Sequence, residues 1–150
     1  MLKNIASELS PDLLWCLASM GHGETIVVVD RNFPAHDVAK NTSSGKIIEL
    51  PGLDVPAACR VILSVMPLDD FIPSPVACMQ VVGEPEKILP MQQEVHEIAL
   101  KAEARTFPME RLERFAFYEA AKKSFAVVRT SEFRPYGCFI FTMGVIFDRR

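Results

Sequence analysis

The sequence predicts an α/β fold, a single layered domain over residues 1–150 in which a mixed β-sheet is flanked by helices. Apolar runs of strand length alternate with amphipathic segments of helix length, and this alternation favours layered α/β packing. The 150 residues are the usual size of one domain, and no repeat, low-complexity block or linker divides them. The connection between the last two predicted strands is too short for a helical crossover, so we expect a mixed sheet.

The first predicted helix and the first predicted strand have clear local signals. Ser10 can cap the helix and Pro11 fits its first turn. Apolar residues then recur at helical spacing as far as Met20, and Gly21 suits the C-terminal end. Residues 25–29 are a continuous β-branched run. Such a run is typical of a central strand that is covered on both faces.

The remaining elements follow from the same patterns of apolar spacing, caps and breakers. They are a loop at 31–34, polar turns at 38–46, a strand at 46–50, a helix from its cap Asp54 to about Met66, a strand at 76–82, a helix within 86–104 that begins or kinks at Pro90, a helix at 114–123, and strands at 125–128 and 139–141. Helices and strands therefore alternate through most of the chain.

Composition and charge limit the classes of partner. Apolar residues make up 49% of the chain and charged residues 23%, with a net charge of −3 and no strong clustering of Lys and Arg. A nucleic-acid surface usually shows such clustering, so no nucleic-acid partner is expected. No apolar stretch approaches the roughly 18 residues of a membrane span. The N-terminal segment lacks the features of a secretory signal, and we expect a cytoplasmic protein.

The mean hydropathy of +0.18 is high for so short a chain. A small domain leaves much of its surface exposed, so the apolar excess indicates either burial between subunits or simply a core rich in leucine and valine. The four cysteines are widely spaced and form no CxxC pair. We expect buried, reduced thiols at Cys16, Cys59, Cys78 and Cys138.

Two candidate site residues flank the first strand. The tripeptide Gly21-His22-Gly23 precedes it, and the glycines leave the imidazole approachable. Histidine exchanges protons near neutrality because its ordinary pKa is about 6.5. Asp30 stands where the strand should end, and ligands gather beyond the carboxyl ends of strands in α/β sheets. Asp30 could bind hydroxyls or orient His22. The alternatives are a histidine that only closes a loop and an ordinary turn aspartate.

The later candidates lie at the start of the last predicted helix and just before the last predicted strand. Arg114 opens an aromatic run that contains Tyr118, and most of this run is expected to be core. Arg114 either reaches a ligand oxygen or forms a surface ion pair. Tyr136 and Gly137 precede the last apolar strand and suit the lip of a pocket, although a turn tyrosine is also common. Cys138 as a nucleophile would need a nearby base.

Other chemistries lack their motifs. The sequence contains no GxGxxG or Walker-type phosphate loop, no HExxH and no GxSxG elbow. Its three histidines, His22, His36 and His96, do not have a recognised zinc spacing. We therefore expect neither a metal site nor a nucleotide cofactor.

Taken in order, these segments resemble the fucose mutarotases of the RbsD/FucU family. The combination is specific although each piece is not, and it covers nearly the whole chain. The family also contains ribose pyranases, which share the glycine-histidine and aspartate elements, but the aromatic run is closer to the fucose branch. The resemblance is carried by 10–14, 20–23, Asp30, 32–36, 67–69, 113–128, Tyr136, Gly137 and 143–145.

The resemblance implies an RbsD-like fold and a cofactor-free sugar mutarotase, which interconverts the α and β anomers of L-fucose or a related monosaccharide. It also implies a site between neighbouring subunits of a homo-oligomer, since family members commonly form rings that include decamers of two stacked pentamers. Ribose pyranase activity is one alternative. A non-catalytic monosaccharide-binding or regulatory protein on the same scaffold is another.

The resemblance also assigns roles to residues. His22 is the acid/base residue, which Asp30 and Tyr136 assist. The sugar is bound by Asp30, Arg114, Tyr118, Tyr136, Gly137 and Cys138. The last of these departs from the family, whose tyrosine-glycine-asparagine element ends in an amide. A thiol is a weaker hydrogen-bond partner than an amide, so sugar preference or affinity could differ here.

Overall fold

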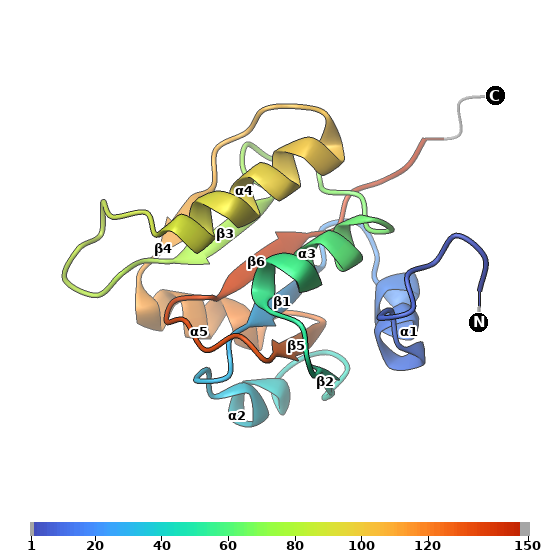
Figure 1. Cartoon of the computed structure of the whole chain (residues 1–150), viewed down its shortest axis with the longest axis horizontal. Helices are drawn as coiled ribbons and strands as arrows, with labels where there is room; N and C mark the ends of the chain where they lie inside the picture. Colours follow the sequence, from blue (N-terminus) through green and yellow to red (C-terminus); the bar gives the residue numbers. More distant parts are fainter. Residues whose placement is uncertain (1, 148–150) are drawn as a thin grey trace.

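The computed structural model describes residues 2–147 as a six-stranded sheet with helices on both faces (Figure 1). The strands are β1 (Thr25–Val29), β2 (Ile47–Leu50), β3 (Val76–Met79), β4 (Glu110–Leu112), β5 (Ala126–Thr130) and β6 (Phe139–Thr142). The helices are α1 (Pro11–Ser19), α2 (Ala35–Ala39), α3 (Val55–Leu63), α4 (Pro90–Glu103) and α5 (Arg114–Lys122).

The strand order is β2-β5-β1-β6-β3-β4. Strand β6 is antiparallel to its neighbours β1 and β3, whereas the other adjacent strands are parallel. The prediction of a mixed sheet flanked by helices is therefore confirmed.

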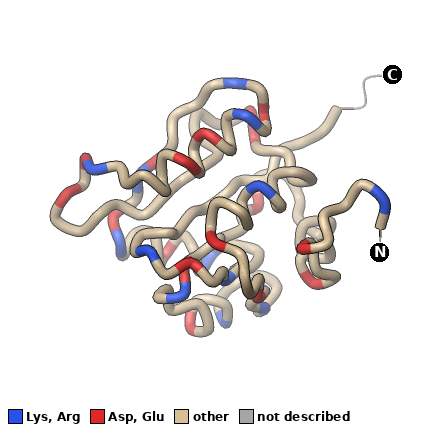
Figure 2. The backbone as a smooth tube through the Cα atoms, in the orientation of Figure 1, with Lys and Arg blue, Asp and Glu red and all other residues tan. Residues whose placement is uncertain are grey.

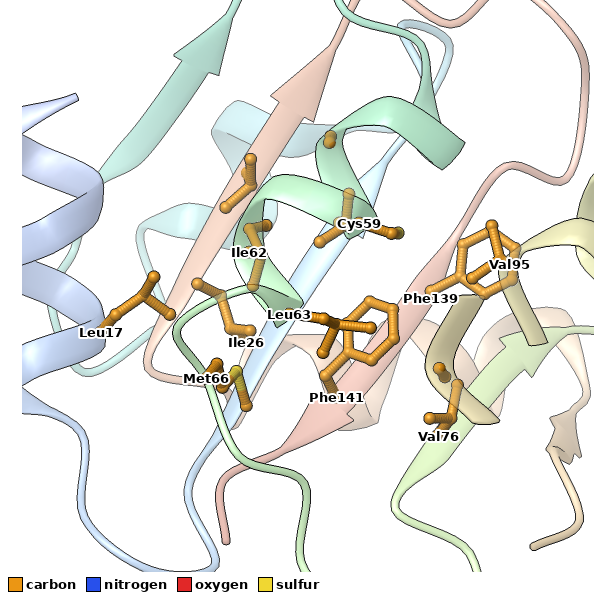
Figure 3. Packing of buried hydrophobic residues seen from close by; sticks show 14 of the residues in the cluster. Leu17, Ile26, Cys59, Ile62, Leu63, Met66, Val76, Val95, Phe139 and Phe141 are labelled. Carbon is orange, nitrogen blue, oxygen red and sulfur yellow. The ribbon is translucent and has the colours of Figure 1, made fainter. Parts of the chain in front are cut away.

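Strand β1 is the centre of the sheet because its β-branched side chains are buried on both faces. Ile26 and Val28 pack into one hydrophobic cluster with α1, α3 and α4. Val27 and Val29 pack into the other cluster with α2 and α5. Figure 3 shows part of the first cluster, where Ile26 lies among side chains of α1 and α3. This arrangement confirms the central, doubly covered strand that the sequence predicts.

The capping residues named from the sequence do begin helices. Ser10 Oγ accepts a hydrogen bond from the Leu13 N–H at 3.3 Å at the start of α1. Asp54 Oδ1 accepts one from the Ala57 N–H at 2.9 Å at the start of α3. Pro90 is the first residue of α4. These signals are local, because a cap and the N–H that it binds are three residues apart.

Several boundaries differ from the sequence prediction. Helix α3 and strand β3 both end three residues early, at Leu63 and Met79. The short elements α2 and β4 were not predicted at all. A helix of five residues has little stability of its own, and α2 forms because its apolar residues pack under the sheet. Strand β4 is a three-residue edge strand that depends on pairing with β3.

The order of the strands determines where the loops pass. Strands β5 and β6 follow one another in sequence, yet β1 lies between them in the sheet. The connection over 131–138, which we term the crossing loop, must therefore pass over the carboxyl end of β1. Asp30 immediately follows β1, so this topology brings the crossing loop and Asp30 together.

Lys and Arg are interspersed with Asp and Glu along the backbone (Figure 2). The four cysteines are free and buried, as the sequence predicts. Within residues 2–147, no helix combines the length and the apolar character that crossing a bilayer requires.

Candidate functional site

A cavity of about 260 Å³ lies at the carboxyl end of β1. Ligand pockets usually measure about 300–1,000 Å³, so this one suits a small ligand. Five of the six predicted sugar-binding residues line it, and the sixth, Gly137, contacts Asp30 beside it. Its lining consists of Asp30, Asn32, Phe33, Met79, Val82, Arg114, Tyr118, Pro135, Tyr136 and Cys138.

Asp30 is the buried acid of this cavity, with only 3% of its surface exposed. Its Oδ1 accepts hydrogen bonds from the N–H groups of Asn32 (2.9 Å) and Phe33 (3.1 Å). Its Oδ2 accepts from the Gly137 N–H at 3.0 Å and lies 3.6 Å from Cys138 Sγ. Burial raises the pKa of Asp30, and these hydrogen bonds offset only part of the effect. The carboxyl group can therefore hold a proton closer to neutrality than an exposed aspartate.

The crossing loop presents Tyr136 in an unusual backbone conformation. Its φ of 62° lies in the left-handed region, which non-glycine residues rarely adopt. The Tyr136 hydroxyl accepts a hydrogen bond from the Val82 N–H at 3.2 Å, and its carbonyl accepts one from Gln92 Nε2 at 3.5 Å. A Cβ on Gly137 would lie 3.3 Å from the Cβ of Asp30. The absence of a side chain at Gly137 thus allows the loop to approach Asp30 closely.

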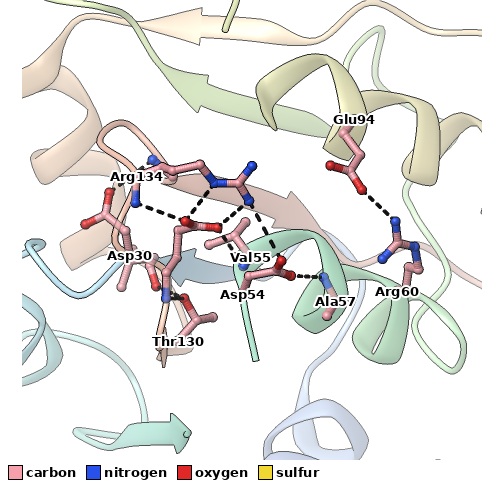
Figure 4. A network of polar contacts seen from close by, with 11 residues as sticks. Asp30, Asp54, Val55, Ala57, Arg60, Glu94, Thr130 and Arg134 are labelled. Atoms are coloured by element: carbon pink, nitrogen blue, oxygen red, sulfur yellow. Dashed lines mark hydrogen bonds and ion pairs between the residues drawn. The ribbon is translucent and has the colours of Figure 1, made fainter. Parts of the chain in front are cut away.

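An ion pair between a buried glutamate and a half-exposed arginine anchors the other half of the crossing loop (Figure 4). Glu132 is 1% exposed, and its two oxygens accept hydrogen bonds from Arg134 Nε at 2.9 Å and Nη2 at 2.8 Å. The hydrogen bonds from Arg134 outweigh burial and lower the pKa of Glu132 to about 2. Glu132 also accepts from the Val55 N–H at 3.4 Å, and Arg134 lies 3.8 Å from Asp54. The loop is thereby fixed to the first turn of α3.

Helix α5 contributes the cation and a second tyrosine. Glu113 caps the helix through hydrogen bonds from the N–H groups of Phe115 and Ala116, and this cap fixes Arg114 at the first helical position. Arg114 Nε donates to the Tyr118 hydroxyl at 3.2 Å. A guanidinium remains charged at any physiological pH and offers further donors. Arg114 can therefore bind ligand oxygens at the mouth of the cavity.

His22 does not line this cavity. It precedes β1, whereas Asp30 follows it, and the five-residue strand alone is about 16 Å long. The sequence left open that Asp30 orients His22, but in one chain the partner is Asp69, whose Oδ1 lies 3.0 Å from His22 Nε2. The ring of Phe71 lies beside the imidazole, with 5.1 Å between ring centroids. Within one chain, His22 is thus separated from the cavity that Asp30 and the other predicted residues line.

Several lining residues were not predicted as site residues. Asn32 and Phe33 follow Asp30 directly, so their position after the strand was an available signal. Met79 is the last residue of β3 and Val82 lies in the turn that follows; both are far from Asp30 in the sequence, and no local pattern indicates them. Asp69 lies in a segment that carries the family resemblance, but no role was predicted for it. Across residues 2–147, no three His, Cys, Asp or Glu side chains gather in a way that could hold a metal ion.

Residues 3–146 match the model of the RbsD / FucU transport protein family. The fucose mutarotase of Mus musculus is 42% identical over 149 residues, which cover 97% of this chain and 95% of the relative. The L-fucose mutarotase of Actinobacillus pleuropneumoniae is 38% identical over 146 residues, with 97% of each chain covered.

Comparison with solved structures indicates the same family. The crystal structure of the protein Atu2016 has a TM-score of 0.94 at 45% identity and covers 98% of this chain and 97% of its own. The fucose mutarotase of Streptococcus pneumoniae in complex with L-fucose has a TM-score of 0.84 at 33% identity, with 97% and 100% covered. The structure of RbsD of Bacillus subtilis complexed with D-ribose has a TM-score of 0.72 at 26% identity, and the match covers 98% of this chain and 100% of RbsD. The resemblance seen in the sequence is confirmed, and the chain belongs to the RbsD / FucU transport protein family.

Proposed function

We propose that this protein is a sugar mutarotase that interconverts the α and β anomers of L-fucose or a closely related monosaccharide. The observation that carries the proposal is the cavity at the end of β1, where the buried Asp30, the charged Arg114 and two tyrosine hydroxyls converge. Two relatives, at 42% and 38% identity over nearly the whole chain, are fucose mutarotases. The fucose-bound structure is also more similar to this chain than the ribose-bound one.

The chemistry requires only proton transfer. A pyranose changes anomer when the anomeric hydroxyl loses its proton and the ring oxygen gains one, so that the ring C–O bond breaks and an aldehyde forms. Rotation about the adjacent C–C bond and the reverse steps then give the other anomer. A positioned acid/base group contributes about 10²–10⁴-fold to such a reaction. No electron leaves the sugar, so the proposal includes no cofactor.

In this mechanism His22 moves the proton. Arg114 donates hydrogen bonds to sugar oxygens, and Asp30 and Tyr136 orient hydroxyls or assist the second transfer. The raised pKa of Asp30, caused by its burial, fits a group that exchanges protons with a hydroxyl.

We propose further that His22 enters the cavity of an adjacent copy. Exposed apolar side chains lie at both ends of the molecule, with Phe71 and Phe147 near His22 and Val82 and Phe115 near the cavity. Exposed apolar groups of this kind mark interaction surfaces. Because the two surfaces differ, they join head to tail, and such contacts close into rings. A homo-oligomer, with the decamer as one form, is thus part of the proposal.

Subunit mixing tests the shared site. His22→Ala and Arg114→Ala should each lose most anomer exchange, measured by saturation-transfer NMR on L-fucose. When the two variants are co-assembled, about a quarter of the interfaces combine a native His22 with a native Arg114, and exchange should recover to that extent. Sedimentation checks that each variant still assembles. Folded His22→Ala protein with near-native exchange would contradict the mechanism, and a mixture without recovery would contradict the shared site.

The same NMR measurement separates the alternatives. Exchange between the pyranose and furanose forms of D-ribose would indicate ribose pyranase activity. Line broadening without exchange, for L-fucose, D-ribose and galactose alike, would indicate a binding protein. We place the protein in the cytoplasm because its four cysteines are free and buried, as in reducing compartments.

A further inference from the structure

Gln92 is a buried polar side chain of α4 that the mechanism so far does not use. It is 1% exposed and occupies the third position of the helix. Its Oε1 accepts a hydrogen bond from the Leu89 N–H at 3.0 Å, and its Nε2 donates to the Met79 carbonyl at 2.9 Å and to the Tyr136 carbonyl at 3.5 Å. Because a carboxamide has two N–H donors, one side chain joins the start of α4 to two walls of the cavity.

The contact with Tyr136 falls on a peptide group that also binds Asp30. The Tyr136 carbonyl and the Gly137 N–H belong to the same planar peptide. Gln92 donates to that carbonyl, while the N–H donates to Asp30 Oδ2 at 3.0 Å. Glycine tolerates a wide range of backbone angles, so Gly137 by itself would leave this peptide free to rotate. Gln92 and Asp30 hold the peptide from opposite sides.

Close packing surrounds this peptide. A Cβ on Gly137 would lie 3.2 Å from Met91 Cε, which shows how closely the first turn of α4 approaches the crossing loop. The Met79 N–H donates to the Cys138 carbonyl at 3.2 Å, so the end of β3 is also joined to the loop. Because Gln92 is buried here, removing its N–H donors leaves two carbonyls without that partner, and water does not readily replace it.

We propose that Gln92 is a positioning residue, which orients the Tyr136–Gly137 peptide so that its N–H binds Asp30 and the tyrosine side chain lines the cavity. This inference rests on the proposed function of the cavity. A hydrogen bond to a peptide carbonyl polarises the group and strengthens its N–H as a donor. Gln92 therefore acts on the buried acid of the site through one peptide, without lining the cavity itself.

Gln92→Met tests this role because methionine has a similar length and no N–H donor. Gln93→Met is the matched control, since Gln93 is the next residue of α4, is exposed and donates to Glu97 at 2.9 Å. In Gln92→Met the kcat/KM of L-fucose exchange should fall by about two- to twelvefold, which corresponds to one net hydrogen bond. Gln93→Met should match the wild type. Sedimentation and circular dichroism check that both variants fold and assemble.

Isotope labelling isolates the peptide itself and needs no sugar. Of the two tyrosines, only Tyr136 precedes a glycine, so ¹³C-carbonyl tyrosine and ¹⁵N-glycine together label a single ¹³C–¹⁵N pair. In the wild type the ¹H shift of the Gly137 amide should titrate with Asp30. In Gln92→Met this proton should move to lower chemical shift. The midpoint of its titration should move to higher pH, because a weaker N–H donor lowers the pKa of the carboxyl group less.

Other ionisable groups also face Asp30. Arg114, Tyr118 and Tyr136 line the same cavity, and Cys138 Sγ lies 3.6 Å from the carboxylate. The proposed acid/base histidine of an adjacent copy completes this set. Neither methionine substitution alters any of these groups, so a shift of the midpoint in one variant alone reports the peptide N–H.

Gln92→Glu is the second variant, which keeps the proposal testable if Gln92→Met does not fold. Its carboxylate still accepts the Leu89 N–H at the start of the helix but lacks both N–H donors. It should lower kcat/KM and move the Gly137 amide proton in the same direction as Gln92→Met.

An unchanged kcat/KM, or an unchanged amide proton and titration midpoint in a folded Gln92 variant, would overturn the proposal. The same holds for a fall in kcat/KM that Gln93→Met shares. If the wild type exchanges no sugar at all, the proposed function fails, and the labelled peptide still decides whether Gln92 orients it.

Discussion

At the residue scale, Cys138 lies against the buried acid Asp30. The sequence resemblance predicts asparagine at this position; Cys138 is almost fully buried, and its Sγ lies 3.6 Å from Asp30 Oδ2. Burial, and next to it the charge of Asp30, raise the pKa of the Cys138 thiol well above its ordinary value. The group stays protonated, which argues against a nucleophilic role and leaves it as a weak donor to Asp30.

We predict that Cys138→Asn changes the relative exchange rates of L-fucose and competing sugars without changing the fold. An amide donates two hydrogen bonds and accepts others. One net hydrogen bond is worth about 0.5–1.5 kcal/mol, which corresponds to about two- to twelvefold in rate or binding. Saturation-transfer NMR on a panel of sugars measures the ratio, with Cys138→Ala as the control for loss of the thiol alone. Unaltered ratios for every sugar would show that the cavity acts through backbone contacts at this position.

At the scale of elements, the crossing loop is held at both of its ends. Glu132 and Arg134 attach it to the first turn of α3, while Gly137 donates to Asp30 next to β1. This anchoring allows Tyr136 to keep its left-handed backbone conformation. The loop is thus a rigid wall of the cavity, and its stability depends on an ionised Glu132.

We predict an acid-dependent loss of stability from Glu132. Its folded pKa of about 2 is below the ordinary 4.5, so its contribution is fully present above pH 4.5 and is lost as the pH falls towards 2. At about 1.4 kcal/mol per pKa unit the contribution is at most about 3.5 kcal/mol, and water around the half-exposed Arg134 reduces it. Denaturant unfolding should show that Glu132→Gln is less stable than the wild type at pH 7 and that the difference narrows by pH 3.

The contribution of Asp30 to folding stability depends on pH in the opposite direction. Because its folded pKa is raised, it favours the folded state at low pH, and that contribution is lost as the pH rises through the folded value. Comparing the wild type with Glu132→Gln at each pH removes this background. A stability difference that is constant from pH 7 to pH 3 would contradict the assignment to an ionised Glu132.

At the scale of the whole molecule, the two halves of the proposed site lie at opposite ends of β1. Phe71 and Phe147, which lie near each other beside His22, are 64% and 65% exposed. Exposure of this extent is unusual for phenylalanine in a small domain unless another surface covers it. Exposed apolar side chains therefore contribute to the high mean hydropathy of the chain together with the core.

We predict that the protein sediments as an oligomer and that Phe147→Asp reduces assembly and anomer exchange together, because His22 then leaves the neighbouring cavity. Sedimentation and NMR exchange across a dilution series measure the two properties in parallel. A fully active monomer of 16.8 kDa would contradict the shared site. Phe147→Asp protein that remains assembled and active would show that this surface is not the interface.

The sequence by itself determined the elements with local causes. Ser10 and Asp54 cap helices through N–H groups three residues away, and the run over 25–29 is buried on both faces because each of its side chains is apolar or β-branched. The position of Asp30 after that run and of His22 before it also follows from the chain alone. The resemblance to the family depended on the same local segments.

Only the tertiary structure decided which of these residues meet. Asp30 contacts Gly137, 107 positions away, because β1 lies between β5 and β6 and the crossing loop must pass over it. The pairing of His22 with Asp69 and the formation of α2 and β4 likewise depend on packing between distant segments. Strand order is set by the burial of whole faces rather than by any local pattern, so the sequence could name candidate residues but could not place His22 apart from the cavity.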